Sequence, residues 1–215
     1  MSYKTVYNEK TIEIEIKKSR FIGYVSPVSS EEEAMDFVEK IKKLNPAARH
    51  NCYAYIIGEK MITQRYSDDG EPSGTAGIPI LEILKKKNLT DICVVVTRYF
   101  GGILLGAGGL VRAYSSACNE VTNKAVIVEK QEFSEMEIEV DYNNYGRVLN
   151  YIEENEYYIL DKVFETEVLI KLYIKSELVK NFEKSILDLT SGNVKIIIDN
   201  VLLLPTKNNK LYIEG

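Results

Sequence analysis

The distribution of apolar residues divides the 215-residue chain near residue 130, and this division limits its fold more than any other feature. The part after residue 130 alternates between strand-type and helix-type periodicity in the order βαββαβ. The charge balance changes at the same place: residues 1–130 hold 18 Lys and Arg against 16 Asp and Glu, whereas 131–215 hold 9 against 16. We therefore predict two domains, 1–130 and 131–215.

The βαββαβ order of the second part is typical of the ferredoxin-like fold, in which two helices cover one face of a four-stranded sheet. The sequence predicts strands at 133–140, 158–164, 167–174 and 194–204, and helices around 145–152 and 178–189. Many unrelated functions use this fold, so it assigns no chemistry by itself.

The first part mixes strands and helices. Extended runs at 11–16 and 21–28 precede a helix that Ser30 caps and Asn45-Pro46 ends. The sequence then predicts, in order, a hairpin at 52–66, a short helix ending in Lys85-Lys86-Lys87, a buried strand at 92–96 and a helix that includes 110–121. Together the two parts predict an α+β chain.

Composition and residue counts exclude several classes of protein. No apolar run approaches the ~18 residues that a membrane helix needs, and the start has no apolar core of a secretion signal. Three cysteines without a CxxC pair provide neither a disulfide framework nor a four-thiolate zinc site. His50 is the single histidine, which excludes mechanisms that need two imidazoles. We expect a cytoplasmic protein with no membrane partner and no cofactor.

Glycines concentrate in the first part, where eight of the 13 fall between residues 70 and 109. The glycine-rich segment leads from the buried strand into a helix, where free backbone amides and the positive end of the helix dipole favour anions. Arg98 ends the strand and Arg112 lies near the start of the helix, so both could converge on one phosphate or carboxylate. Alternatively, the glycines permit close helix–sheet packing, and both arginines pair with Asp68 or Asp69.

We therefore assign candidate residues to an anion- or RNA-binding site, with no catalytic residue and no metal ligand. The binding residues are Lys85, Lys86, Lys87, Arg98, Tyr99, Gly101, Gly102, Gly106, Gly108, Gly109 and Arg112. The expected loop partners are His50, Asp68, Asp69, Glu71 and Ser73.

The segment 67–74 places three carboxylates and two hydroxyls within eight residues. These are ligand types that magnesium prefers, so a metal-assisted phosphate site is one interpretation. The spacing differs from a calcium loop, and Asp-Asp-Gly followed by Pro-Ser-Gly is also typical of a turn before a helix cap. A structured loop is the other interpretation.

His50 and Cys52 lie two residues apart at a strand start and so share a face. They suggest either a zinc or thiol-nucleophile pair, or a strand-end histidine beside a small buried thiol. Tyrosines of the first part have two interpretations as well. Tyr53, Tyr55, Tyr99 and Tyr114 could stack on nucleic-acid bases, or pack in strands and helices with one polar end.

Three long strings of the first part closely resemble the YigZ/IMPACT family. They are RHNCYAY (49–55), SDDGEPSGTAGIPIL (67–81) and VVVTRYFGGILLGAGGLVRAYSSA (94–117). The resemblance implies an N-terminal domain with the ribosomal protein S5 domain-2-like fold, shared with elongation factor G domain IV, the ribonuclease P protein and the GHMP small-metabolite kinases. It also implies a C-terminal domain similar to the ferredoxin-like domains of elongation factor G. The eukaryotic members regulate translation by restraining an amino-acid-starvation kinase.

The resemblance and the residues together favour a non-enzymatic regulator that binds RNA or a ribosome-associated factor through the glycine-rich loop. One alternative is a phosphate- or nucleotide-binding enzyme related to the small-metabolite kinases, with Asp68 or Asp69 holding magnesium. Another is a protein–protein adaptor that uses the acidic second domain.

Overall fold

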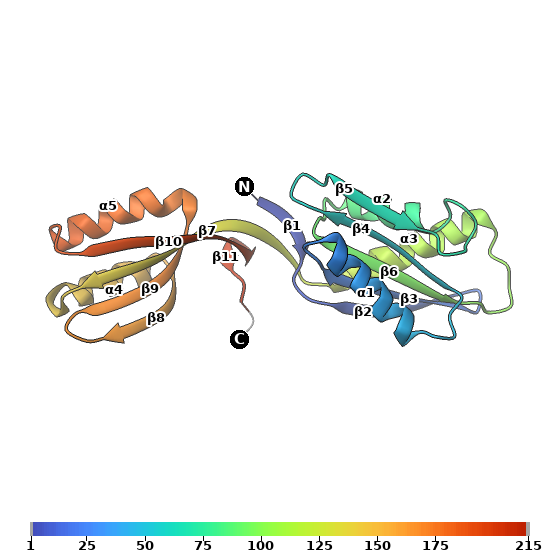
Figure 1. Ribbon diagram of the computed structural model, residues 1–215, viewed down its shortest axis with the longest axis horizontal. Coiled ribbons are helices and arrows are strands. Elements are labelled where there is room, and N and C mark those ends of the chain that lie inside the picture. The colour runs from blue at the N-terminus through green and yellow to red at the C-terminus, as the bar shows by residue number, and fades with distance from the viewer. Residues whose placement is uncertain (1, 214–215) are drawn as a thin grey trace. The chain divides into compact units, whose positions relative to one another are not determined.

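The computed structural model describes residues 2–213, which separate into two compact units (Figure 1). The N-terminal unit is Ser2–Glu129, and the C-terminal unit begins at Lys130. The described residues form two antiparallel sheets and five α-helices, so the chain is α+β as predicted. No described helix is long and apolar enough to cross a membrane.

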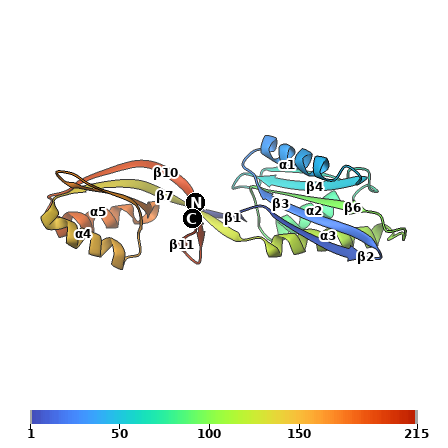
Figure 2. The same ribbon diagram turned by 90° about the horizontal axis from the view of Figure 1, so that it is seen from below.

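The N-terminal unit is built on a five-stranded sheet in the order β2-β3-β6-β4-β5. Its elements are β1 (Ser2–Val6), β2 (Lys10–Ile16), β3 (Ser19–Pro27), α1 (Glu31–Leu44), β4 (His50–Ile57), β5 (Thr63–Ser67), α2 (Gly77–Lys86), β6 (Ile92–Tyr99) and α3 (Ala107–Lys124). Helix α1 covers one face of the sheet, and α2 and α3 cover the other (Figure 2).

Both faces of this sheet are therefore buried, and the sequence of its central strand reflects this. Val94 and Val96 of β6 pack towards α2 and α3, whereas Cys93 and Val95 pack towards α1. A strand covered on both faces has a continuous apolar run instead of an alternating one. This explains why β6 was predictable as a buried strand.

The C-terminal unit is a second antiparallel sheet whose two helices cover one face (Figure 2). Its elements are β7 (Ile127–Val140), which begins in the N-terminal unit, α4 (Tyr142–Glu154), β8 (Tyr158–Phe164), β9 (Val168–Lys175), the short 3₁₀ helix η1 (Ser176–Leu178), α5 (Val179–Thr190), β10 (Lys195–Lys207) and β11 (Lys210–Leu211). The strand order is β11-β10-β7-β9-β8, and β1 also pairs with β7. Alternate residues of β9, from Val168 to Ile174, face the helices and form the core.

Every helix and strand predicted from the sequence is present, and two strands were missed. Strand β1 is mostly polar, and distant partners hold it in place. Thr90 N donates to the backbone oxygen of Lys4 at 3.0 Å, and the Thr5 side chain donates through Oγ1 to Asp91 O at 3.0 Å. Strand β11 is only two residues long. Neither carries a hydrophobic period that a sequence pattern could detect.

The N-terminal unit should fold without the rest of the chain. Both of its hydrophobic clusters, one on each face of the sheet, consist only of residues between Val6 and Ala125. We predict that a fragment of residues 1–129 unfolds in one cooperative thermal transition, measured by circular dichroism. A soluble fragment that melts gradually, without a transition, would contradict this prediction.

Candidate anion-binding site

A buried ion pair occupies the centre of the predicted site. Arg98 Nη1 donates to Glu71 Oε1 at 2.7 Å, and the two side chains are 7% and 4% exposed. Tyr114 Oη donates to the same carboxylate oxygen at 2.8 Å. The Arg98 guanidinium also lies 5.6 Å from the ring centre of Phe21 and 5.5 Å from that of Phe100. Arg98 is therefore not an unpaired cation, because its guanidinium already pairs with Glu71 inside the protein, and its role as an anion ligand stays a prediction.

The two aspartates of the acidic loop bind backbone amides instead of arginines. Asp68 accepts from Gly74 N at 2.8 Å, Ala76 N at 3.0 Å and Gly77 N at 2.8 Å. Asp69 Oδ2 accepts from Asn51 N at 2.7 Å. A carboxylate at the start of α2 also compensates the positive end of that helix.

These contacts support the structured-loop interpretation of segment 67–74. The segment is a structured loop, and no cluster of three metal-ligating side chains occurs among residues 2–213. The proposed pairing of Arg98 and Arg112 with Asp68 or Asp69 is wrong: the partner of Arg98 is Glu71. Ser73 is exposed on the same loop.

The glycines of the β6–α3 loop serve different purposes. A Cβ on Gly101 would lie 2.0 Å from the carbonyl of Lys18, so glycine permits the β2–β3 turn to contact this loop. Gly106 has φ +70° and caps α3, while Gly102 has φ +84°. A Cβ on Gly108 would have no heavy atom within 4 Å. Packing therefore explains Gly101 but not Gly108.

The start of α3 is open to solvent. The amides of Ala107, Gly108 and Gly109 have no backbone acceptor in the described structure, since the first bond of the helix is Leu110 N to Gly106 O at 3.0 Å. Arg112 is exposed and forms no ion pair with any described residue. It lies one turn after Gly108 on the same helix face, and helical side chains tilt towards the N-terminus. Its guanidinium can thus reach an anion held by these amides.

A surface pocket of about 520 Å³ lies beside this loop. Its lining residues are Ala47, Arg49, His50, Arg98, Tyr99, Phe100 and Leu104. His50 Nδ1 lies 2.9 Å from Asp69 O, and because a carbonyl only accepts, Nδ1 donates this hydrogen bond. Tyr99 Oη donates to Asn45 at 3.0 Å, which fixes the phenol against the end of α1.

This end of the N-terminal sheet, which we name the Arg98 end, gathers four cations that form no ion pair with described residues. Lys17 and Lys18 form the β2–β3 turn, Arg49 precedes β4, and Arg112 lies on α3. The strand register explains why the turn and the start of β4 lie here, since Arg20 lies opposite Tyr99 and His50 opposite Arg98. The corresponding loops meet at the right-hand end of the unit in Figure 1.

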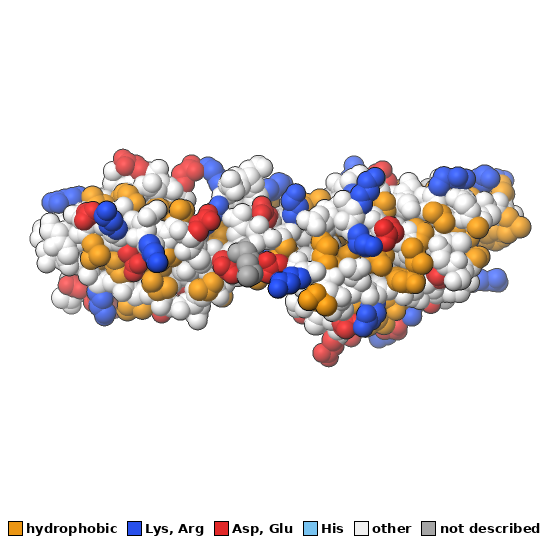
Figure 3. Space-filling model, turned by 90° about the horizontal axis from the view of Figure 1, so that it is seen from above, with side chains coloured by type: hydrophobic (Ala, Val, Ile, Leu, Met, Phe, Trp, Pro, Cys, Tyr) orange, Lys and Arg blue, Asp and Glu red, His pale blue; other side chains and the backbone are white. Residues whose placement is uncertain are grey.

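Apolar side chains accompany these cations. Phe100, Ile103 and Leu104 are 57%, 41% and 83% exposed. Figure 3 shows hydrophobic side chains at this end of the molecule with Lys and Arg nearby. Sequence reasoning missed Lys17, Lys18 and Arg49, although two adjacent lysines in a hairpin turn were a usable signal.

The lysines that end α2 are not part of this site. Helix α2 leads back to the start of β6, so its last lysines, Lys85 to Lys87, lie at the opposite end of the sheet from Arg98. Along β6, six residues or ~20 Å separate Ile92 from Arg98. Lys85 pairs with Glu82 at 2.8 Å. Lys87 Nζ donates to Asn119 O, Thr122 Oγ1 and Asn123 Oδ1, and burial lowers the pKa of its ammonium. Lys86 is exposed. The expectation of one continuous basic site is therefore wrong.

The remaining candidates have structural roles. Tyr114 is fully buried, and Tyr55 is buried with its hydroxyl on Glu31 at 2.7 Å, so neither can stack on a base. Cys52 Sγ donates to Asp68 O at 2.9 Å, and burial raises the pKa of its thiol. His50 contacts Asp69. The structure therefore favours the interpretation of His50 and Cys52 as structural residues.

Removal of Glu71 should destabilise the fold strongly. We predict that Glu71→Ala lowers the free energy of unfolding by about 3–5 kcal/mol, because it leaves a buried guanidinium without a counter-ion. The matched control, Glu82→Ala, breaks an exposed pair and should cost about 0–1 kcal/mol. Urea unfolding measures both, and equal costs would contradict a structural role for the buried pair.

The three thiols should be unreactive in the folded protein. Cys52, Cys93 and Cys118 are buried, and burial raises the pKa of Cys118 to about 12. A raised pKa keeps the thiol protonated at pH 8, whereas the thiolate is the nucleophile. We predict no rapid reaction with a disulfide reagent at pH 8, and reaction of all three after unfolding. Fast reaction of one thiol in the native protein would show that this cysteine is accessible.

Comparison with known protein families covers both units. The chain matches the Impact N-terminal domain over residues 17–122 and a domain of unknown function, DUF1949, over residues 138–193. It is 45% identical over 195 residues to IMPACT family member YvyE of Bacillus subtilis (strain 168), which covers 91% of this chain and 90% of that protein. It is 33% identical to IMPACT family member YigZ of Escherichia coli (strain K12), covering 87% and 93%.

A more distant relative and one solved structure extend these matches. Protein IMPACT of Oryctolagus cuniculus is 32% identical over 124 residues, which cover 55% of this chain and 38% of that protein. A structure described as "Crystal structure of an hypothetical protein" has a TM-score of 0.61 at 31% identity and covers 93% of this chain and 98% of its own. The resemblance of the three sequence strings is confirmed, and the chain belongs to the IMPACT family.

Proposed function

We propose that this protein is a non-enzymatic regulator of translation that binds RNA through the Arg98 end of its N-terminal unit. One observation carries the proposal: unpaired cations and the open start of α3 gather at the same end of the sheet. Lys17, Lys18, Arg49 and Arg112 supply the charge, and the amides of 107–109 supply hydrogen-bond donors. Cationic side chains and free backbone amides are the two kinds of group that bind phosphates in proteins.

The apolar residues of the β6–α3 loop add a second kind of contact. Phe100 and Leu104 are exposed on this loop, where unstacked bases could pack on them. A mixed surface of this kind suits single-stranded RNA, because each nucleotide offers a phosphate and a flat apolar base. Because the net charge of the chain is −5, we propose that RNA contacts this local basic site and not the surface of the whole chain.

Family membership supports the regulatory part of the proposal. The resemblance implies that eukaryotic members regulate translation, and we extend this role to the present chain. We further propose domain boundaries at 1–130 and 131–215, an S5 domain-2-like fold for the first domain and a ferredoxin-like fold for the second. The strand order β10-β7-β9-β8, with α4 and α5 on one face, supports the second assignment. A cytoplasmic location follows from the proposed role.

The kinase alternative has less support at the site itself. It assigns magnesium to Asp68 or Asp69, but backbone amides already occupy Asp68 on both oxygens and Asp69 on one. The adaptor alternative predicts a different result in the RNA-binding experiment described below. A protein–protein adaptor would show no affinity for RNA even at low salt.

Substitution of the free cations should weaken RNA binding without unfolding the protein. We predict that Arg112→Ala costs about 1–3 kcal/mol of binding and less than about 0.5 kcal/mol of stability, because the side chain is exposed and unpaired. Lys86→Ala, at the opposite end of the sheet, is the matched control and should bind normally. Filter binding with single-stranded and ribosomal RNA measures affinity, and urea unfolding measures stability.

The salt dependence gives an independent check on the same complex. With a few phosphate contacts, the plot of log affinity against log salt should have a slope of roughly −2 to −4. Arg112→Ala should reduce this slope by about one. A flat salt response, or equal affinity of Arg112→Ala and Lys86→Ala, would contradict RNA binding at the Arg98 end.

Gly108→Ala tests whether a ligand approaches the helix start. The new methyl group meets no protein atom within 4 Å, and alanine favours helix over glycine, so stability should stay the same or rise by up to ~1 kcal/mol. RNA affinity should nevertheless fall, because the methyl group lies where a phosphate would contact the amides. Unchanged affinity would show that RNA does not approach this backbone.

A further inference from the structure

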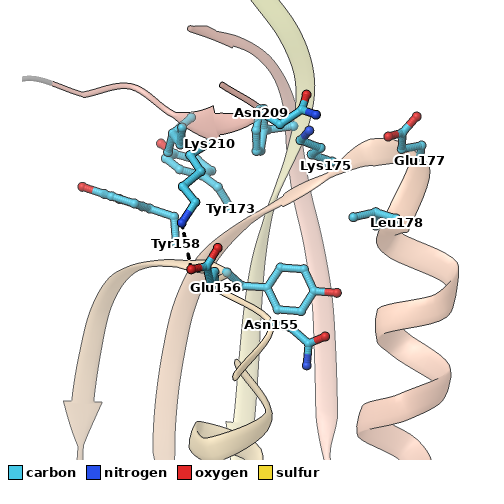
Figure 4. Close-up of a pocket in the computed structure, with 12 residues that line it drawn as sticks. Asn155, Glu156, Tyr158, Tyr173, Lys175, Glu177, Leu178, Asn209 and Lys210 are labelled. Atoms are coloured by element: carbon cyan, nitrogen blue, oxygen red, sulfur yellow. Dashed lines mark hydrogen bonds and ion pairs between the residues drawn. The ribbon is translucent and has the colours of Figure 1, made fainter. Parts of the chain in front are cut away.

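A second pocket lies wholly within the C-terminal unit, far along the chain from the residues of the proposed RNA site (Figure 4). Its volume is about 410 Å³, in the lower part of the ~300–1,000 Å³ range of small-ligand sites. The apolar part of its lining comes from Phe133, Tyr157, Tyr158, Tyr173, Leu178 and Leu211. A pocket of this size and character fits one ring-sized molecule.

The walls of the pocket are held by contacts between distant segments. Tyr158 at the start of β8 stacks on Tyr173 of β9, with ring centres 6.3 Å apart. Tyr157 lies edge-on to Phe182 of the core at 5.1 Å. Lys210 Nζ pairs with a carboxylate oxygen of Glu156 at 2.8 Å, drawn as a dashed line in Figure 4, and so joins the β10–β11 hairpin to the end of α4. Contacts between distant segments therefore position the aromatic lining of the pocket.

Two opposite charges on the same side of the pocket lack partners. Lys175 ends β9 and Glu177 lies in η1, and neither forms an ion pair with the other or with any other described residue. In Figure 4, Lys175 lies beside Asn209, and Glu177 lies above Leu178 at the start of the helix, where its side chain is exposed. Ser176 lies between these two residues in the sequence, and its hydroxyl forms a hydrogen bond of 3.1 Å with the hydroxyl of Ser134, which holds this segment against β7. The pocket thus presents one cation and one anion beside an aromatic surface.

We propose that this pocket binds a free α-amino acid with an aromatic or large apolar side chain. The carboxylate of the ligand pairs with Lys175, its ammonium group pairs with Glu177, and its side chain packs among the tyrosines. A zwitterion satisfies both charges at once, whereas a neutral aromatic compound leaves both unpaired. A nucleotide would place several negative charges beside Glu177 and Glu156, in a part of the chain with 9 Lys and Arg against 16 Asp and Glu.

The inference goes beyond the proposed RNA-binding function and uses different residues, so either can fail without the other. Isothermal titration of the full chain with L-phenylalanine, L-tyrosine, L-tryptophan and L-leucine tests it. We expect saturable binding of at least one of them at one molecule per chain. L-Phenylalanine amide, which lacks the carboxylate, and N-acetyl-L-phenylalanine, which lacks the ammonium, should each bind about tenfold or more weakly than L-phenylalanine.

Two variants assign the charges to the residues. Lys175→Met and Glu177→Gln should each weaken L-phenylalanine about tenfold or more. Lys175→Met should not weaken the binding of L-phenylalanine amide further, because this compound already lacks the carboxylate that pairs with Lys175. Glu177→Gln should likewise not weaken the binding of N-acetyl-L-phenylalanine further, because this compound lacks the ammonium group that pairs with Glu177. The matched controls on α5, Lys180→Met and Glu183→Gln, lie outside the pocket and should bind normally.

Three results would overturn the proposal. The first is that none of the four amino acids binds at concentrations up to about 10 mM, tenfold above a ~1 mM dissociation constant. The second is that both pocket variants bind as well as the control variants. The third is that the amide and the N-acetyl compound bind as tightly as L-phenylalanine itself. Thermal melts of all variants establish that they are folded.

Discussion

The carboxylate of Glu71 connects three parts of the N-terminal unit. It accepts from Arg98 on β6 and from Tyr114 on α3, while its own loop leads into α2. A buried guanidinium is costly unless a carboxylate faces it, so the position of the loop is fixed by the position of the arginine. Asp68 three residues earlier can then accept the amides at the start of α2. Strand, loop and both helices are thus set by one buried pair.

The elements of the fold could be predicted because their hydrophobic periods are strong. The continuous run of β6 and the alternating run of β9 each follow from which faces are covered. The family could be identified from three strings, since they are long and specific. Strand β1 could not be predicted, because its place is set by pairing with β7 and not by its own apolar residues.

The site was harder to predict, because its partners are distant in sequence. The sequence suggested Asp68 or Asp69 as the partner of Arg98, and only the geometry selects Glu71, 27 residues away. Lys85 to Lys87 were placed correctly at a helix end, but no pattern shows at which end of the sheet that helix stops. The pocket of the C-terminal unit combines β7, the α4–β8 loop, β9, η1 and the last hairpin, which no sequence spacing brings together.

The fixed position of the β6–α3 loop has a consequence for the behaviour of the protein in solution. Gly101 lies directly against Lys18, and in this arrangement Phe100, Ile103 and Leu104 stay exposed. An apolar tip held in water favours contact between copies, while the surrounding lysines and arginines repel other copies. Salt screens the repulsion but leaves the apolar attraction in place. We therefore expect contact between two such tips to be disfavoured at low ionic strength and promoted at high ionic strength.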